Sequence, residues 1–217
     1  MKINYDILME KELKEIEKLG TKPKLLLHSC CAPCSSAILE FLQEYFDITV
    51  YFYNPNITFE DEYIKRLNEQ REYHKKRGYN IDVIEGRYNP KEDFFEKIKG
   101  LEKEREGGRR CYVCYTLRLE AAARKAVELG FDYFSSVLSI SPMKNAGWIN
   151  EIGERLAREY NLKFLNGDFK KRGRYLRSIE ISREYELYRQ DYCGCVFSKL
   201  ERERLEKEKR EKSGGQE

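Results

Sequence analysis

The residues best able to carry out chemistry are seven cysteines, which fall into three short groups along the chain. The groups are Cys30-Cys31-Ala-Pro-Cys34, Cys111-Tyr-Val-Cys114 and Cys193-Gly-Cys195. Thiolates are ligands of zinc and of iron–sulfur clusters, and closely spaced thiols form redox couples. The sequence therefore indicates a metal centre, a reactive dithiol, or both.

The first two groups fall where helices are predicted to begin. Cys34 opens a helix predicted over 34–45, and Cys111 opens one predicted over 111–129. A helix N-terminus has unpaired N–H groups and a partial positive charge, so it favours thiolate over thiol. Thiolates held so closely repel one another unless a cation joins them, and this favours a bound metal.

Cys30 and Cys31 together with Cys111 and Cys114 are enough to hold one tetrahedral zinc or one iron–sulfur cluster. We favour the cluster because adjacent side chains such as Cys30 and Cys31 are expected to diverge. Divergent thiols suit the separated corners of a cluster better than a single ion. Thiols that are simply buried or regulatory are a third interpretation.

The third group has the spacing of a redox couple. Only one glycine separates Cys193 from Cys195, and a disulfide across so short a link is strained and readily reduced. We therefore predict a catalytic dithiol, Cys193 and Cys195, that relays electrons beside the metal centre.

The elements that position these groups alternate between strand and helix. Strands are predicted over 24–28, 48–53, 81–84, 131–138 and 162–165, and helices over 2–19, 34–45, 59–76, 90–99, 111–129, 145–160 and near 178–188. This alternation is typical of an α/β fold with a mostly parallel sheet, helices on both faces and extra helices at both termini. In such a fold ligands bind at the carboxyl ends of the strands, and the cysteines lie in connections or at element ends.

Length and composition set the remaining limits. The chain has 217 residues, which suits a single catalytic domain over 1–198 followed by a charged tail over 199–217. Seven basic and five acidic residues between 199 and 212 indicate a solvated helix, and the final Ser-Gly-Gly-Gln-Glu is expected to be disordered. The 41 basic and 38 acidic residues nearly cancel, to a net charge of +3, so charge alone indicates no polyanionic ligand.

No apolar run approaches the ~18 residues of a membrane span, and the N-terminus lacks the apolar centre of a signal peptide. We therefore expect a cytoplasmic protein, where structural disulfides are rare and seven cysteines need another explanation. We expect it to be a monomer with no membrane partner.

Five motifs occur in order: His28-Ser-Cys-Cys-Ala-Pro-Cys34, Tyr53-Asn-Pro-Asn-Ile57, Arg110-Cys-Tyr-Val-Cys-Tyr115, Ser141-Pro-Met-Lys-Asn145 and Tyr192-Cys-Gly-Cys195. Together they resemble the QueH family of epoxyqueuosine reductases, over about residues 22–198. The resemblance implies a HUP-type, Rossmann-like α/β fold. It also implies reductive removal of the epoxide oxygen from epoxyqueuosine, at the wobble position of a tRNA anticodon, to give queuosine.

The same resemblance implies the roles of site residues. A [4Fe–4S] cluster would be bound by Cys30, Cys31, Cys111 and Cys114. The redox-active pair would be Cys193 and Cys195. The partners would be a tRNA substrate and an electron donor that the sequence does not identify.

Several nearby residues have two interpretations each. Cys34 could bind a second metal, an additional mononuclear iron, with Asp191, or it could be a small buried residue. His28 could donate a proton or bind metal, although a histidine at a strand end is more often packed. Lys144 and Asn145 could contact the anticodon backbone or cap the next helix. Asn54 and Asn56 could contact substrate hydroxyls or form a turn.

An RNA substrate requires a basic surface. The candidate tRNA-binding residues precede the second cysteine group, follow the fourth strand, or form a run without intervening acids. They are Arg105, Arg109, Arg110, Lys144, Lys170, Lys171, Arg172, Arg174 and Arg177. Tyr175 could stack on an unpaired base, although an ordinary solvated face explains the run equally well.

Two other functions compete with the reductase. An ATP-dependent tRNA sulfur transferase also combines an α/β fold with cysteines, but no glycine-rich phosphate loop follows the first predicted strand. A zinc-stapled binding protein without enzymatic activity would explain the cysteines but not the spacing of Cys193 and Cys195.

Overall fold

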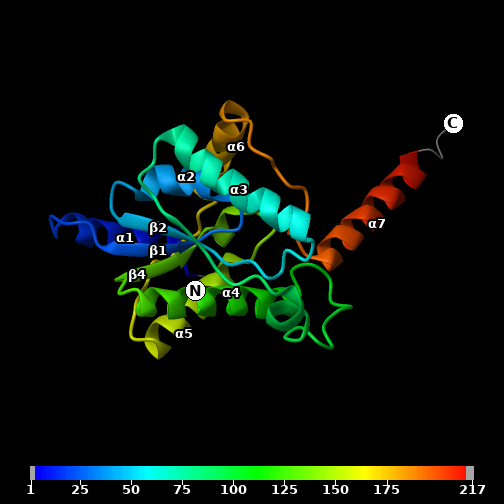
Figure 1. Ribbon diagram of the computed structural model, residues 1–217, viewed down its shortest axis with the longest axis horizontal. Helices are drawn as coiled ribbons and strands as arrows, with labels where there is room; N and C mark the ends of the chain where they lie inside the picture. Colours follow the sequence, from blue (N-terminus) through cyan, green and yellow to red (C-terminus); the bar gives the residue numbers. More distant parts are fainter. Residues whose placement is uncertain (1–2, 214–217) are drawn as a thin grey trace.

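Five parallel strands form the centre of the molecule in a computed structural model that describes residues 3–213 (Figure 1). The strands are β1 (Lys24–His28), β2 (Asp47–Phe52), β3 (Val83–Glu85), β4 (Tyr133–Ser136) and β5 (Lys163–Phe164), in the order β3-β2-β1-β4-β5. Leu25, Leu26 and Leu27 of β1 are all fully buried, because both faces of the central strands are covered. The predicted α/β fold with a parallel sheet is confirmed.

Helices lie on both faces of this sheet (Figure 1). α2 (Ala32–Leu42), α3 (Glu60–Arg77) and α6 (Arg174–Glu184) pack together on one face, and α4 (Arg109–Glu128) and α5 (Ala146–Glu159) pack together on the other. The extra terminal helices are α1 (Tyr5–Glu17) and α7 (Val196–Ser213), of which α7 projects away from the domain. Within residues 3–213, no helix is long and apolar enough to cross a membrane.

The chain reverses its direction of winding between β1 and β4, which are neighbours in the sheet. After β1 the chain enters α2 on one face, whereas after β4 it enters α5 on the other. A crevice forms at such a switch point because the two connections leave in opposite directions. The first cysteine group follows β1, so the topology places it at this crevice.

Some predicted boundaries are wrong. The strand predicted over 131–138 ends at Ser136, whose hydroxyl accepts a hydrogen bond from the Leu138 N–H and starts a 3-10 turn over Val137–Ile140. The helix predicted over 90–99 is a single π-helical turn, Lys91–Phe95. The predicted division into a domain over 1–198 and a tail over 199–217 stays a prediction, although residue 198 lies within α7. The disorder expected at the C-terminus concerns residues that, apart from Ser213, lie outside the described part of the chain.

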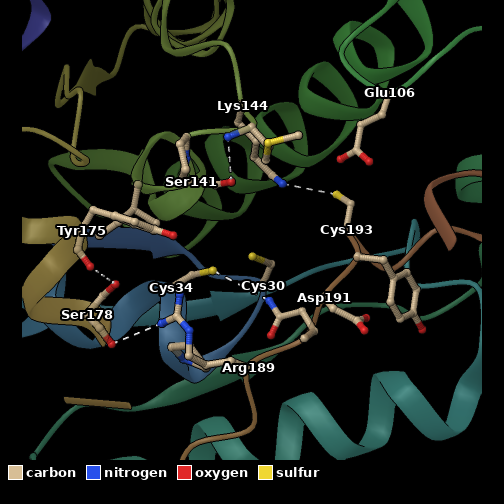
Figure 2. Close-up of a pocket in the computed structure, with 16 residues that line it drawn as sticks. Cys30, Cys34, Glu106, Ser141, Lys144, Tyr175, Ser178, Arg189, Asp191 and Cys193 are labelled. Carbon is tan, nitrogen blue, oxygen red and sulfur yellow. Dashed lines mark hydrogen bonds between the residues drawn. The ribbon is translucent and has the colours of Figure 1, made fainter. Parts of the chain in front are cut away.

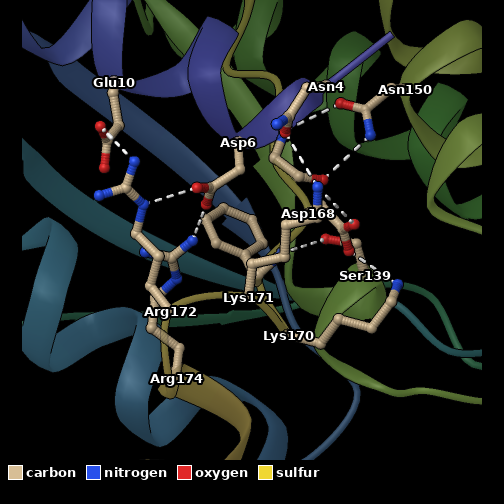
Figure 3. A network of polar contacts seen from close by, with 12 residues as sticks. Asn4, Asp6, Glu10, Ser139, Asn150, Asp168, Lys170, Lys171, Arg172 and Arg174 are labelled. Atoms are coloured by element: carbon tan, nitrogen blue, oxygen red, sulfur yellow. Dashed lines mark hydrogen bonds and ion pairs between the residues drawn. The ribbon is translucent and has the colours of Figure 1, made fainter. Parts of the chain in front are cut away.

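A buried carboxylate attaches α1 to the segment that leads into α6 (Figure 3). Asp6 is 3% exposed and accepts hydrogen bonds from Arg174 and, at 2.7 Å, from Nε of Arg172. Arg172 also donates to Glu10 at 2.7 Å, and Lys171 donates to Asn4 Oδ1 at 2.9 Å. These contacts, together with burial of Met9, Leu13 and Ile16, hold α1 against the domain.

These contacts, which we call the α1 clamp, show that the basic run over 170–177 has acidic partners, contrary to the reason for predicting a basic surface there. The run from Lys170 to Arg177 contains no acids, but acids outside the run pair with it. Lys170 pairs with Asp168 at 2.7 Å, and Arg177 with Glu40 at 2.8 Å. Lys171, Arg172 and Arg174 are therefore not a free positive surface, and the missing acids in this stretch of sequence gave no reason to assign them to tRNA.

We expect Asp6→Ala to lower the free energy of unfolding by about 3–5 kcal/mol, the usual effect of removing one partner of a buried ion pair. The loss arises because Arg174, 8% exposed, keeps its charge without a carboxylate. Urea denaturation would measure it. Combining Asp6→Ala with Arg174→Met should recover much of the loss, and Glu10→Ala, at a more exposed carboxylate, should change little. An equal effect of Asp6→Ala and Glu10→Ala would contradict the clamp.

Candidate metal and dithiol site

The connection between β1 and α2 brings three thiols together. The Sγ atoms of Cys30, Cys31 and Cys34 all lie within 4.8 Å of one another. Cys31 is the N-cap of α2, with an extended backbone, and Pro33 fits the first turn because its missing N–H would have had no partner there. Residues three apart at a helix start face the same side, which brings Cys34 toward Cys31; Figure 2 shows Cys34 beside Cys30.

The three thiols affect one another's ionisation. Hydrogen bonds donated by Cys31 and Cys34 hold the pKa of Cys30 well below its ordinary value, and the same bonds raise the pKa of Cys34. Burial, followed by the hydrogen bond to Cys30, raises the pKa of Cys31 to about 12. Nε2 of Gln190 also donates to Cys31 Sγ at 2.9 Å. A metal bound here would displace the remaining thiol protons and supply the missing positive charge.

The expected divergence of Cys30 and Cys31 is wrong. Their sulfur atoms are 3.9 Å apart, close to the ~3.8 Å edge of a tetrahedron with ~2.3 Å metal–sulfur bonds. Adjacent cysteines are therefore no argument against a single ion. The choice between a cluster and one ion must depend on the thiols contributed by other elements.

The second cysteine group lies at the start of α4 and faces an adjoining cavity. Cys111 and Cys114 line it together with Cys193 and Cys195. Burial raises the pKa of both α4 thiols, that of Cys114 to about 11. In the described part of the chain, only Cys30, Cys31 and Cys34 converge closely enough to share one ion. The joint ligand set of Cys30, Cys31, Cys111 and Cys114 thus stays a prediction.

Cys193 forms part of the wall of both cavities. It lines the enclosed cavity with Cys111 and Cys114, and it lines an open pocket of about 250 Å³ with Cys30 and Cys34 (Figure 2). The same open pocket also includes Lys144, Tyr175, Gln190 and Asp191. The three cysteine groups therefore meet around one wall at the crevice, and this places the dithiol beside the candidate metal ligands.

The two thiols of the third group have different surroundings. Cys193 is half-buried, and its Sγ is 3.3 Å from Nζ of Lys144. Cys195 is 7% exposed, and burial, with a contribution from the charge of Cys193, raises its pKa to about 12. Gly194 between them has φ +115°, and a Cβ there would lie 2.9 Å from Ile57 Cγ1, so only glycine fits.

Lys144 belongs to this site rather than to the cap of α5. Asn145 provides the cap, since its Oδ1 accepts a hydrogen bond from the Trp148 N–H at 3.2 Å, which confirms that interpretation for Asn145. Burial alone would lower the pKa of Lys144, but the nearby thiols, Cys193 first, raise it above its ordinary value. Lys144 is therefore an ammonium, held 3.3 Å from the sulfur atom of Cys193.

Two residues near the thiols escaped the sequence analysis. Arg118 is 1% exposed and lines the enclosed cavity, and Gln190 contacts Cys31. Arg118 follows Cys111 by seven positions and Cys114 by four, so the helical repeat already placed it on the cysteine face. No comparable signal existed for Gln190, because its contact depends on the path of an irregular segment.

Other candidates have structural roles. His28 is fully buried and hydrogen-bonded to Ser136 Oγ at 2.8 Å, and burial lowers its pKa to about 4, which supports the packed interpretation. Arg110, 2% exposed, donates to backbone carbonyls that include Glu102 O at 3.0 Å, and so holds its own loop. Arg109 is exposed but paired with Glu104.

Asp191 lines the open pocket with Cys34, as a second metal site would require. Its carboxylate, however, is 60% exposed and pairs with Arg202 at 2.8 Å. A second ion held by Cys34 and Asp191 would have to compete with this ion pair.

Comparison with known proteins identifies the family. Residues 25–201 match the family model described as "Epoxyqueuosine reductase QueH". The chain belongs to the QueH family. It is 47% identical over 204 residues to the QueH of Staphylococcus epidermidis, covering 92% of this chain and 86% of that protein. It is 48% identical over 201 residues to the QueH of Streptococcus pyogenes, covering 91% and 78%.

More distant members match as well. The QueH of Thermotoga maritima is 37% identical over 180 residues, covering 82% of this chain and 91% of that protein. Among solved structures, the U34-tRNA thiolase NcsA from Methanococcus maripaludis with its [4Fe–4S] cluster aligns with a TM-score of 0.39 and 12% identity, over 82% of this chain and 74% of that one. A structural likeness at that level carries no functional argument.

In the reduced, metal-free protein we expect iodoacetamide to label Cys193 at least ~10-fold faster than Cys195 near neutral pH. Cys193 faces a pocket beside an ammonium, whereas the pKa of Cys195 leaves it a thiol until the pH rises far above neutral. Mass spectrometry of the tryptic peptides would measure both rates. Lys144→Met should slow labelling of Cys193, and Lys144→Arg should largely preserve it. Equal rates for the two thiols would contradict the asymmetry.

Proposed function

We propose that this chain is an iron–sulfur-dependent epoxyqueuosine reductase that acts on tRNA carrying the epoxide at the anticodon wobble position. The observation that carries the proposal is the meeting of a dithiol and several metal-binding thiols around one pocket, in a chain of the QueH family. Relatives of that name are 37–48% identical to it over most of its length.

The donor set fits an iron–sulfur cofactor. Seven thiols line or adjoin the two cavities, more than a single zinc uses, and unpaired cationic donors lie beside them. Cys30, Cys31, Cys111 and Cys114 would hold a [4Fe–4S] cluster. When bound, the cluster supplies electrons one at a time and a Lewis-acidic iron. Cys34 and Asp191 would contribute to a further mononuclear iron.

The dithiol can supply the two electrons and two protons that the overall reaction consumes. Converting the epoxide to an alkene breaks both C–O bonds, consumes two electrons and two protons, and releases the oxygen as water. Oxidation of Cys193 and Cys195 to a disulfide releases two electrons and two protons, so one dithiol matches one turnover. An external electron donor must then reduce the disulfide.

Lys144 is the residue best suited to give a proton to the oxygen. Breaking a C–O bond develops negative charge on that oxygen, which a nearby ammonium stabilises and then neutralises. Nζ of Lys144 lines the open pocket and lies 3.3 Å from Cys193 Sγ, so one residue serves both the dithiol and the bond that breaks.

The pocket mouth suits an unpaired nucleoside. Met143 is 70% exposed at the rim, and Tyr175 lines the pocket, so both offer apolar surface on which bases of an anticodon loop could stack. We expect the protein to act in the cytoplasm as a monomer, where tRNA is abundant and thiols stay reduced.

The competing functions are not favoured. After β1 the chain places Cys30, Cys31 and Pro33 where a glycine-rich loop would bind ATP phosphates. A non-enzymatic zinc protein would not explain why Cys193 and Cys195 differ in burial or why Lys144 lies beside Cys193.

Anaerobic purification should give a brown protein with sulfide close to the iron content. Cys193→Ser should keep the metal and the colour but lose conversion of epoxide-containing tRNA, because the dithiol can no longer donate two electrons. Metal and sulfide analysis and nucleoside analysis of the tRNA would measure both effects.

The control for this experiment is Glu10→Ala, which alters the clamp on α1 and should retain turnover. Lys144→Met should also keep the colour but slow turnover by about 10²-fold, the usual effect of removing a general acid. Colourless protein with one zinc and no sulfide would refute the reductase in favour of the zinc protein. ATP-dependent insertion of sulfur into tRNA would favour the sulfur transferase.

A further inference from the structure

Arg118 is a buried cation that lies 5.8 Å from the centre of the Tyr115 ring and whose terminal nitrogens have no hydrogen-bond partner in the described part of the chain. Its side chain is 1% exposed, and Nε donates to the carbonyl of Cys114 at 3.3 Å. The two remaining nitrogens, Nη1 and Nη2, have no hydrogen-bond partner among the described residues. Arg66 is also fully buried, but its charge is paired with the carboxylate of Glu62 at 2.6 Å, as is usual for a buried arginine.

Among residues 3–213, the one acidic side chain that lines the cavity with Arg118 does not pair with it. Glu106 lies on the same wall, but its carboxylate accepts a hydrogen bond from the Ser198 hydroxyl at 2.6 Å. Burial opposes the charge of Arg118, but Cys114 first, then Cys193, Cys30 and Tyr115, raise its pKa. Arg118 lines the cavity together with the thiols of the second and third cysteine groups.

A second unpaired side chain lines the same cavity. Asn56 is 1% exposed, and neither its amide nitrogen nor its amide oxygen has a partner. It comes from the loop after β2, whereas Arg118 comes from α4, so two independent elements direct unmatched N–H donors toward Cys111, Cys114, Cys193 and Cys195.

Burying these unpaired donors and the positive charge of Arg118 is energetically unfavourable unless an anion binds to them. An unpaired charge in a protein interior is disfavoured by several kcal/mol, and an unmatched buried amide by less. Water could accept hydrogen bonds from the N–H groups but would not neutralise the charge of the guanidinium. An iron–sulfur core bound by four thiolates has a net negative charge and exposes sulfide acceptors, so it fits both donors.

We propose that Arg118 and Asn56 donate hydrogen bonds to the sulfur atoms of the cluster and that Arg118 stabilises its reduced form. The inference rests on the proposed function, since it requires the cluster to be present. Reduction adds one negative charge, and a fixed cation beside the cluster favours the more negative state. Arg118 thereby raises the reduction potential and makes the cluster easier to reduce.

The first test is a potentiometric titration of the anaerobic holoprotein, followed by electron paramagnetic resonance. Arg118→Met should lower the ratio of reduced to oxidised cluster about ten-fold at a fixed potential, equivalent to ~59 mV for one electron. Asn56→Leu should shift the ratio in the same direction by less, because it removes a neutral donor. Arg174→Met removes a buried arginine that lines neither cysteine cavity, and should leave the potential unchanged.

The second test compares thermal unfolding with and without the cluster. Without it, Arg118→Met should be as stable as wild type or more stable, because an unpaired buried charge has been removed. With it, the same variant should be less stable than wild type. Arg118→Lys keeps the charge but not the planar fork, so it should retain most of the potential and lose part of the stabilisation.

The outcomes separate this inference from the proposed function. Unchanged potential in Arg118→Met, with cluster and turnover intact, would overturn the role of Arg118 and leave the reductase standing. Destabilisation by Arg118→Met that is equal with and without the cluster would show that Arg118 serves packing only. A wild-type protein that assembles no cluster would refute both proposals.

Discussion

The arrangement of the site follows from one electrostatic constraint, which is that thiolates gathered in a buried crevice need positive charge close by. Hydrogen bonds from its two neighbours hold the pKa of Cys30 well below its ordinary value, and Lys144 lies against Cys193. Arg118 lines a cavity with sulfur atoms from two separate segments, and its terminal nitrogens have no hydrogen-bond partner among residues 3–213. In a medium of low dielectric constant these charges interact strongly, so the cations and thiolates of this site stabilise one another.

The fold meets this constraint through its topology. Because the sheet changes its direction of winding between β1 and β4, the loops after these strands open around one crevice. The loop after β1 contributes the first three thiols, and the loop after β4 contributes Lys144. α4 and the segment before α7 complete the walls. The hydrophobic pattern of the strands thus determines which distant cysteines become neighbours.

Local sequence signals predicted much of this structure. The run KLLLH is β1 to the residue, and Asn145 caps α5 as its type suggests. The three cysteine groups were found by spacing alone. What depends on contacts between distant segments was not predictable: Lys144 and Cys193 are 49 positions apart, and the acid that neutralises Arg174 is 168 positions away. A basic run therefore looked free because most of its acidic partners lie outside it, on α1 and α2.

The position of Cys193 in both cavities has a mechanistic consequence under the proposed function. A dithiol that gave up its electrons at a distance from the metal would need a separate path for reduction. Here one sulfur atom borders the enclosed cavity with Cys111 and Cys114 and also the open pocket with Cys30. Cys195 stays protonated behind it until Cys193 has reacted, since its raised pKa disfavours the thiolate. Only Gly194 separates them, so under the proposed function the backbone would present Cys193 to substrate and keep Cys195 in the enclosed cavity with Cys111 and Cys114.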